Sequence, residues 1–268
     1  MASILDQIFA AKRQELEMTK AAFPPSRIIE EAKQSPAARP FISSLRKRPP
    51  AIIAEIKRAS PSKGDILAEL DPATVARDYE LGGAAAISVL TDRHFKGSLD
   101  DLRAVRRAVE LPLLRKDFIF DPYQVYEARA AGADAILLIA AMLDIDQLGP
   151  LAALAKELGM AALVEAHNRG EFDAAERVHT DLIGINNRDL HTFKTDIATS
   201  VELIGLYWGS ALIVSESGIE TPADIRRLYE AGARAFLIGE GLLRGGTPRE
   251  ALKSLAHALD HKSGHNTE

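Results

Sequence analysis

Charged and amide side chains stand at the ends of several short apolar runs in this sequence. They are Glu55, Lys57, Lys116, Glu165, Asn186, Arg188 and Glu216. Carboxylates and ammonium groups within one site can act as general acids and bases, and burying so many of them without partners or purpose would be costly. Any single one of them could instead form a structural ion pair. As a set, they predict a site that binds a polar, anionic substrate and moves protons.

Small residues follow the last two apolar runs, at Ser217-Gly218 and at Gly239-Glu240-Gly241. Glycine lets a backbone approach a ligand closely, and backbone N–H groups at such turns can bind phosphate. A lone glycine would be explained by the turn itself. The two turns together predict a phosphate site built from the backbone of Gly218, Gly239 and Glu240.

The elements that must position these residues repeat along residues 51–250. Runs rich in Ile, Leu and Val, typical of strands buried on both faces of a parallel sheet, alternate with amphipathic helical segments. Gly82, Gly132 and Gly232, which we expect at helix ends, are separated by 50 and 100 residues, so one unit spans about 25 residues. The expected strands are 51–57, 85–90, 112–116, 134–140, 161–165, 182–186, 211–216 and 235–239.

Eight such units predict an α/β fold of the (β/α)₈ TIM-barrel type. Asp71, Asp121, Thr221 and Thr247 each precede a proline, a pattern typical of helix starts. A doubly wound open sheet is the alternative fold, but the turn after the first strand lacks the glycine-rich pattern of that class. TIM barrels carry their active sites at the C-terminal ends of the strands, where the charged residues stand.

Residues 1–48 differ from the repeat. Apolar residues between Ile4 and Phe9 share one face of a helix, Pro24-Pro25 ends that helix, and a second short helix follows. We therefore expect an N-terminal helical extension over 1–48 that covers the barrel mouth, a catalytic barrel over 49–260 and a polar tail over 261–268. Packing against the outside of the barrel is the alternative role for the extension.

Composition narrows the class of function. The 268 residues carry a net charge of −5, include no cysteine and contain no basic run longer than 46–48. Nucleic-acid binding is therefore not expected, and disulfides and thiolate metal sites are excluded. The histidines lack metal-ligand spacing, no stretch has the ~18 apolar residues of a membrane span, and the N-terminus does not have signal-peptide character. We expect a cytoplasmic monomer without cofactor or metal.

Five segments resemble the indole-3-glycerol phosphate synthase family of tryptophan biosynthesis, and the resemblance covers nearly the whole chain. They are AEIKRASPSKGDI (54–66), LRKDFIFDPYQVYEARAAGADAILLI (114–139), ALVEAH (162–167), IGINNRDL (183–190) and VSESGI (214–219). The resemblance implies a carbon–carbon lyase that needs no cofactor. Its substrate would be the phosphorylated small molecule 1-(2-carboxyphenylamino)-1-deoxyribulose 5-phosphate, and its products would be indole-3-glycerol phosphate, CO₂ and water.

The resemblance also implies roles for individual residues. Lys116 would be the general acid of ring closure, and we expect the nearby cations Lys57 and Arg188 to make its proton easier to release. Glu165 would be the base of the dehydration. The remaining catalytic residues would be Glu55, Lys57 and Asn186. The substrate-binding residues would be Ser60, Phe95, Phe118, Arg188, Glu216 and Ser217. Which of the lysines and glutamates moves which proton stays open.

Two other functions fit parts of the sequence. A phosphoribosyl isomerase of the same fold would need a cysteine–aspartate pair, and the chain has no cysteine. A non-catalytic barrel that binds a phosphorylated metabolite would keep the glycine turns but would have no reason to keep Lys116 and Glu165. The chain departs from the family pattern at Gly241, where a small hydroxyl residue is expected. Phosphate affinity would fall slightly if that hydroxyl matters, and would change little if the contact comes from the backbone.

Overall fold

A computed structural model describes residues 4–60, 64–65, 71–189, 192–242 and 247–260. Its centre is a closed barrel of eight parallel strands in the order β1-β10-β9-β8-β7-β6-β5-β4. The strands are β1 (Ala51–Ile56), β4 (Ala86–Leu90), β5 (Leu113–Lys116), β6 (Ala135–Ile139), β7 (Ala161–Ala166), β8 (Leu182–Asn186), β9 (Leu212–Glu216) and β10 (Ala235–Ile238). The predicted TIM barrel is confirmed, and each predicted strand lies within one residue of its observed bounds.

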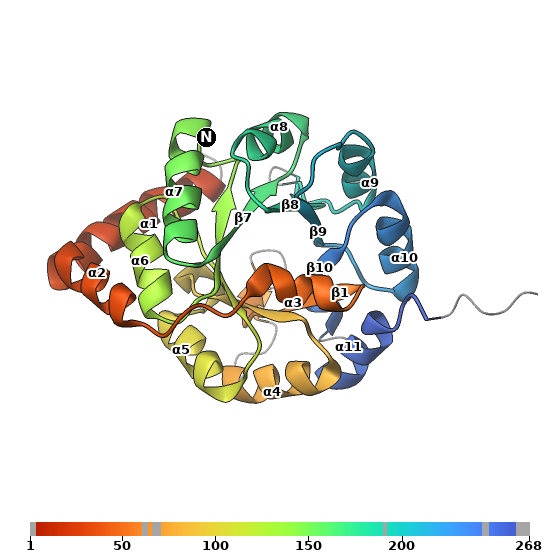
Figure 1. Cartoon of the computed structure of the whole chain (residues 1–268), viewed down its shortest axis with the longest axis horizontal. Helices are drawn as coiled ribbons and strands as arrows, with labels where there is room; N and C mark the ends of the chain where they lie inside the picture. The colour runs from red at the N-terminus through yellow and green to blue at the C-terminus, as the bar shows by residue number, and fades with distance from the viewer. Residues whose placement is uncertain (1–3, 61–63, 66–70, 190–191, 243–246, 261–268) are drawn as a thin grey trace, which may run out of the picture.

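Helices surround the barrel and connect successive strands (Figure 1). They are α4 (Pro72–Gly82), α5 (Leu99–Ala108), α6 (Pro122–Ala130), α7 (Ile145–Glu157), α8 (Arg169–Arg177), α9 (Ala198–Gly205), α10 (Pro222–Ala231) and α11 (Pro248–Ala256). Short elements lie in the loops: β2 (Ala59–Ser60), β3 (Gly64–Asp65) and the 3₁₀ turns η1 (Arg93–Phe95) and η2 (Glu240–Leu242).

The helix ends follow the local sequence signals. Asp71, Asp121, Thr221 and Thr247 each accept a backbone N–H bond through the side chain and precede a proline in the first turn, which satisfies N–H groups that have no partner inside the helix. The expectation for Gly82 was wrong by one residue. Gly82 is the last residue of α4, and the left-handed cap is the next glycine, at φ 93°.

Three helices precede the barrel: α1 (Ile4–Ala22), α2 (Pro25–Gln34) and α3 (Phe41–Lys47). The third was not expected from the sequence, and it crosses the N-terminal end of the barrel (Figure 1), where Phe41 and Leu45 join the apolar cluster inside the strands. The second packs on the outside against α6. The α3 and α2 helices therefore contact different parts of the barrel, the first its N-terminal end and the second the outside at α6.

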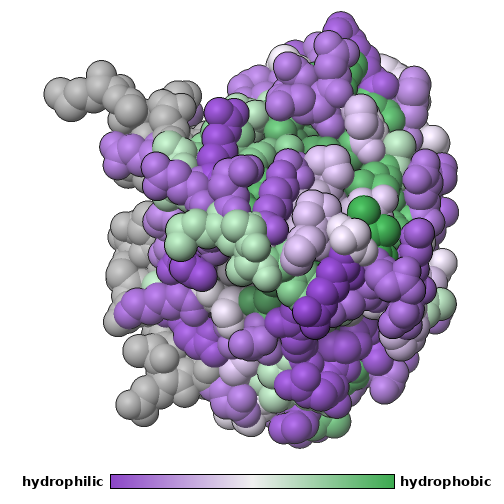
Figure 2. All heavy atoms as spheres, turned by 90° about the vertical axis from the view of Figure 1, so that its left-hand side faces the viewer, coloured by the Kyte–Doolittle hydropathy of each residue, from purple (hydrophilic) through white to green (hydrophobic). Residues whose placement is uncertain are grey.

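Apolar side chains fill two layers. One cluster lies inside the barrel below the strand ends, and a larger one lies between the strands and the surrounding helices. On the side that carries α2, the surface is mostly hydrophilic, with smaller apolar areas between the polar side chains (Figure 2). No helix in the described ranges combines the length and apolar character needed to cross a membrane.

Candidate active site

A cavity of about 420 Å³ lies at the C-terminal ends of the barrel strands. Almost all of the residues that the sequence indicated line this chamber. They are Glu55, Lys57, Phe95, Lys116, Phe118, Glu165, Asn186, Arg188, Glu216, Ser217, Gly218, Gly239 and Glu240. The side chain of Ser60 lies outside the described residues. The barrel therefore gathers into one space residues that are up to 185 positions apart in the chain.

The ammonium group of Lys116 lies between two carboxylates at the centre of this chamber. Lys116 is the last residue of β5 and Glu216 the last of β9, and these strands lie on opposite sides of the barrel. The Nζ atom donates to Oε2 of Glu216 at 3.1 Å and to Oε2 of Glu165 on β7 at 3.0 Å. The lysine side chain thus reaches across the barrel and joins three strands.

Glycines leave room for the buried carboxylates. A Cβ atom at Gly184, in the middle of β8, would lie 2.3 Å from Oε1 of Glu216, and one at Gly239 would lie 2.7 Å from Oε1 of Glu55. Contacts this short are far inside van der Waals distance, so a side chain at either position would displace a carboxylate. The absence of side chains at these two positions helps to set where the acidic groups point.

The charges around Lys116 overturn one expectation. Burial lowers the pKa of Lys116, but Glu165, Glu216 and Glu55 raise it more, and the net value is well above the usual range. The proposed crowding by Lys57 and Arg188 is wrong, because carboxylates surround the ammonium group. In the chamber as it stands, Lys116 is a stable cation.

The two carboxylates beside Lys116 differ in their affinity for protons. Burial raises the pKa of Glu216 to about 8, so this side chain keeps a proton at neutral pH. Burial also raises the pKa of Glu165, but Lys116 and His167 lower it more, and the net value is well below the usual range. The chamber therefore combines one ionised and one protonated carboxyl group around a single lysine.

A second ion-pair group lies beside the first. Lys57 Nζ lies 3.0 Å from Oε1 of Glu55 and 3.8 Å from Oε1 of Glu240, and Nη2 of Arg188 lies 3.4 Å from that same Glu240 oxygen. Asn186, at the end of β8, accepts a hydrogen bond from the backbone N–H of Arg188 at 3.0 Å. Two cations thus stand at the mouth, held in place by carboxylates and by the end of a strand.

The two sides of the chamber differ in polarity. Phe95 and Phe118, after β4 and β5, face each other with ring centroids 6.3 Å apart, and Ile8 of α1 lines the same chamber. On the far side of the barrel from β5, the loop after β9 contributes Ser217 and Gly218, both in the left-handed region at φ 67° and 72°. The loop after β10 contributes Gly239 and Glu240. A ligand with an aromatic end and an anionic end would fit across this mouth.

Gly241 lines the chamber next to these loops. A Cβ atom there would lie 2.8 Å from the carbonyl oxygen of Ile219. A hydroxyl residue at this position would therefore require the backbone after β9 to shift. At position 241 itself, a contact with a ligand must come from the backbone, as one of the two possibilities for Gly241 supposes.

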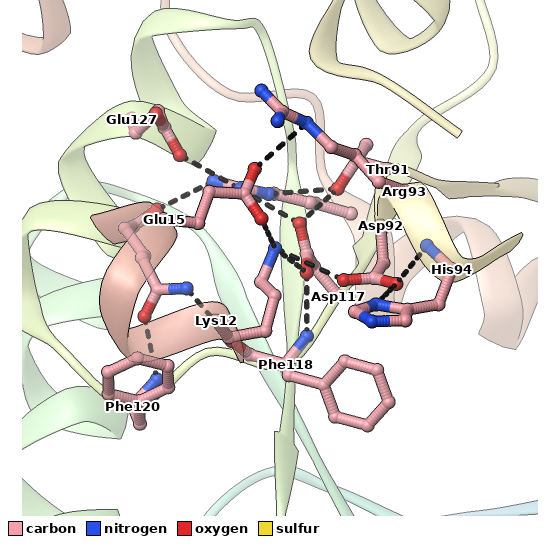
Figure 3. A network of polar contacts seen from close by, with 12 residues as sticks. Lys12, Glu15, Thr91, Asp92, Arg93, His94, Asp117, Phe118, Phe120 and Glu127 are labelled. Carbon is pink, nitrogen blue, oxygen red and sulfur yellow. Dashed lines mark hydrogen bonds and ion pairs between the residues drawn. The ribbon is translucent and has the colours of Figure 1, made fainter. Parts of the chain in front are cut away.

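The first helix is attached to the chamber by a buried cation (Figure 3). Lys12 Nζ lies 2.9 Å from Oδ1 of Asp117 and 3.2 Å from Oδ2 of Asp92. Asp117 directly follows Lys116, and its carboxylate also accepts from Thr91 Oγ1 at 2.6 Å and from the N–H of Phe118 at 2.8 Å. Lys12 therefore connects α1 to the segment after β5, which carries both Lys116 and Phe118.

Sequence reasoning missed several residues at or beside the chamber. They are Ile8, Lys12, Asp92, Asp117 and His167. The two aspartates could have been found, because Asp117 follows Lys116 directly and Asp92 comes two residues after the end of β4. No local pattern indicates Ile8 or Lys12, since their contacts are with loops that are distant in the chain. Within the described residues, no group of three or more His, Asp or Glu could hold a metal ion.

The fold and the chamber together define a class of protein. This is a TIM-barrel enzyme with a lysine and paired carboxylates at the strand ends, opposite glycine-rich loops. A family model described as indole-3-glycerol phosphate synthase matches residues 5–255. The chain belongs to the indole-3-glycerol phosphate synthase family.

Curated relatives agree with the family model. Proteins named indole-3-glycerol phosphate synthase from Polaromonas sp. (strain JS666 / ATCC BAA-500) and Chromobacterium violaceum are 47% and 46% identical to this chain, over 260 and 263 residues. The alignments cover 95% and 96% of the chain and 98% and 99% of the relatives. One from Aromatoleum aromaticum is 46% identical over 260 residues, which are 95% of the chain and 99% of that protein. The isomerase and the non-catalytic barrel are therefore set aside.

Proposed function

We propose that the chamber closes the indole ring of 1-(2-carboxyphenylamino)-1-deoxyribulose 5-phosphate, with Lys116 as general acid and Glu165 as general base. Members of the family are carboxy-lyases of tryptophan biosynthesis, and the chain is one of them. The observation that carries the assignment of roles is the position of the Lys116 ammonium, 3.0 Å from Glu165 and 3.1 Å from Glu216. A charged donor, the Lys116 ammonium, and an ionised acceptor, the Glu165 carboxylate, are thus in direct contact in the chamber.

Ring closure needs a proton donor at the ketose carbonyl. The ring carbon that bears the carboxylate attacks this carbonyl, and its oxygen becomes an alkoxide unless a proton arrives. An alkoxide is a much stronger base than an amine, so Lys116 can protonate it despite its raised pKa, and the ammonium charge stabilises the oxygen as negative charge develops. The carboxylate then leaves as CO₂, which restores the aromatic ring.

Dehydration completes the pyrrole. A base must remove a proton from the ring-closed intermediate while an acid protonates the departing hydroxyl, which leaves as water. Glu165 is the carboxylate that is ionised for the first task. The ionised substrate carboxylate leaves as neutral CO₂, so each turnover takes up one proton from solvent. Glu55 and Lys57, 3.0 Å apart, are the second acid–base pair near the reacting atoms. Asn186 orients groups between the two pairs.

The polarity of the chamber supports one orientation of the substrate. Phe95 and Phe118 would contact the anthranilate ring, and an apolar wall favours loss of the carboxylate charge as CO₂. The phosphate would lie at the opposite side, on backbone N–H groups of Gly218, Gly239 and Glu240.

The remaining polar residues would hold the anionic and hydroxyl groups. Lys57 and Arg188 are suited to the carboxylate or the phosphate. Ser217 and Asn186 would bind the sugar hydroxyls, and Glu216 would offer a carboxyl proton to the substrate. Ser60 keeps its expected role as a substrate ligand.

We further propose that the protein acts in the cytoplasm as a monomer, without cofactor. The expected division into an extension, a barrel over 49–260 and a tail is kept, with the extension contributing Ile8 to the site. Sedimentation analysis of the purified protein tests the oligomeric state.

A turnover assay tests the function. Purified protein is mixed with the anilino-ribulose phosphate, indole fluorescence is recorded, and the products are identified by mass spectrometry. Wild type should form indole-3-glycerol phosphate and CO₂, whereas Glu165→Gln should accumulate material that has not been dehydrated. If Glu165→Gln forms product at the wild-type rate, the assignment of the base is wrong.

A further inference from the structure

His167 lies directly behind Glu165, outside the chamber. It follows the end of β7, and its side chain is 6% exposed. Its Nε2 atom lies 3.3 Å from Oε1 of Glu165, and its Nδ1 atom lies 2.9 Å from Oε2 of Glu171. His167 is not among the residues that line the cavity, so it can influence the reaction only through Glu165.

The start of α8 fixes the orientation of the imidazole ring. Glu171, in the first turn of this helix, accepts the backbone N–H of His167 at 2.8 Å through the same oxygen that faces Nδ1. Its other oxygen accepts from Asn168 at 2.6 Å. The Glu171 carboxylate is therefore held by three donors and can turn little, and the histidine ring is held with it.

Both ring nitrogens face carboxylates, and ionised carboxylates only accept hydrogen bonds. Nδ1 is hydrogen-bonded to Glu171, whereas Nε2 faces Glu165 at ion-pair distance without forming a hydrogen bond. A ring with a proton on each nitrogen, which is a cation, is the form that suits two such neighbours. The charged groups that face it are Glu165 on β7 and Glu171 on α8. Burial lowers the pKa of His167, but the Glu165 carboxylate 3.3 Å from Nε2 and the Glu171 carboxylate bonded to Nδ1 raise it more, to about 10.

Lys116 alone cannot distinguish its two carboxylate neighbours. Its distances to Glu165 and Glu216 differ by only 0.1 Å, and one cation cannot compensate two buried negative charges. Of these two carboxylates, the second cation, His167, contacts Glu165 alone. The structure assigns to His167 the role of a positioning residue that decides which of the two carboxylates beside Lys116 is ionised and acts as the base. This inference rests on the proposed role of Glu165.

The pH dependence of kcat in His167→Gln tests this role. Glutamine keeps a neutral N–H donor of similar reach toward Glu165 but removes the charge. Loss of an opposite charge at this distance raises a carboxyl pKa by about 1–3 units. The acid limb of the plot of kcat against pH should therefore move to higher pH by about that amount, while KM stays the same. Glu171→Gln, which weakens the cation, should shift the limb less, in the same direction.

The matched control is His257→Gln, which removes an exposed histidine at the end of α11 and should leave the profile of wild type unchanged. A limb that stays in place in His167→Gln would overturn the inference. A loss of kcat that is equal at every pH would overturn it as well, because a structural defect has no reason to follow the ionisation of Glu165.

Nitrogen-15 NMR of the histidine side chains gives a second readout on the wild-type protein. The His167 signals, assigned by their loss in His167→Gln or by their response to Glu171→Gln, should show both nitrogens protonated through pH 8. A neutral ring at pH 7 would overturn the inference whatever the reaction is. Full activity of Glu165→Gln together with a charged ring would instead overturn the proposed function and, with it, the selection of a base.

Discussion

The Nζ atom of Lys116 lies 3.0 Å from Oε2 of Glu165, although the two residues are 49 positions apart and stand on different strands. The proposed acid and the proposed base are therefore in contact before substrate arrives. Such contact gives the protons a short route: the proton that Glu165 takes up during dehydration can pass back to Lys116, which lost one during ring closure. The ion pair thus returns to its starting state, and the proton taken up from solvent restores the group that protonated the departing hydroxyl.

Removing residues 1–40 tests what the extension does. This deletion takes away α1 and α2 but leaves α3, which closes the other end of the barrel. Because Ile8 lines the chamber, substrate binding should weaken more than the barrel is disturbed. Steady-state kinetics and thermal melting separate the two effects. An unchanged KM with a much lower Tm would leave only a packing role.

Lys12→Met isolates the attachment of α1. The substitution removes the cation that pairs with Asp92 and Asp117, so the segment after β5 should become less fixed. We expect KM to rise by roughly tenfold, equivalent to about 1.4 kcal/mol of binding. Lys20→Met, which breaks an ion pair between the same helix and Asp121 away from the chamber, is the control and should leave KM near the wild-type value.

Gly218→Val tests the phosphate site. The substitution places a branched side chain at φ 72° and brings Cβ to 2.4 Å from Cγ2 of Thr195, so the backbone N–H can no longer approach a phosphate. KM for substrate and the inhibition constant for inorganic phosphate should both rise. Gly83→Ala carries similar backbone strain at φ 93° but has open space around it, so its KM should not change. Phosphate bound near the loops after β4 or β6 would show the assignment to be wrong.

The buried Glu216 predicts a pH effect on stability. Burial raises its folded-state pKa from 4.5 to about 8, so the native state binds this proton more tightly than the unfolded chain. The associated stabilisation is complete below pH 4.5 and is lost as the pH rises toward 8, with a slope of up to about 1.4 kcal/mol per pH unit. Glu216→Gln cannot lose a proton, so its stability should fall less than that of wild type across this window.

Denaturant unfolding at pH 5, 6, 7 and 8 measures this difference. Glu157→Gln, an exposed position at the end of α7, is the control and should follow the wild-type curve. Parallel curves for wild type and Glu216→Gln would mean that Glu216 is already ionised in the native protein at pH 5.

The strand pattern made the fold and most of the chamber predictable. Continuous apolar runs and Asp-Pro or Thr-Pro pairs are local signals, so they locate the strands and helix starts within a residue or so. The closed barrel then brings strand ends such as Lys116 and Glu216 together without further information. The same logic indicated a phosphate site at the loops of Gly218 and Gly239, a role that stays a prediction.

Contacts between distant segments could not be predicted in the same way. Lys12 is one of several charged residues on an amphipathic helix, and only the folded chain shows that its ammonium is buried against Asp117. The prediction that nearby cations would make the Lys116 proton easier to release was wrong for a related reason. The sequence shows which charges end the strands, but only the barrel geometry shows that carboxylates, and not Lys57 or Arg188, are its nearest neighbours.

Lys116→Met is the most direct test of the chemistry. Methionine keeps much of the stem volume and removes the proton, and general acid catalysis is typically worth 10²–10⁴-fold, or about 3–5 kcal/mol of barrier. We expect kcat to fall by about that factor and KM to change less, as for an interaction made mainly in the transition state. Lys116→Arg should not restore kcat, because a guanidinium group does not release its proton at working pH.

Lys57→Met provides the comparison that assigns the two lysines. Lys57 pairs with Glu55 and lies near Glu240 at the edge of the chamber, so its loss should raise KM markedly if it chiefly binds an anionic group of the substrate. Single-turnover measurements with saturating substrate separate this binding defect from a slow chemical step. If Lys116→Met keeps near-full kcat while Lys57→Met abolishes it, the roles of the two lysines are exchanged, and the ion pair between Lys116 and Glu165 serves to hold the base rather than to supply the proton.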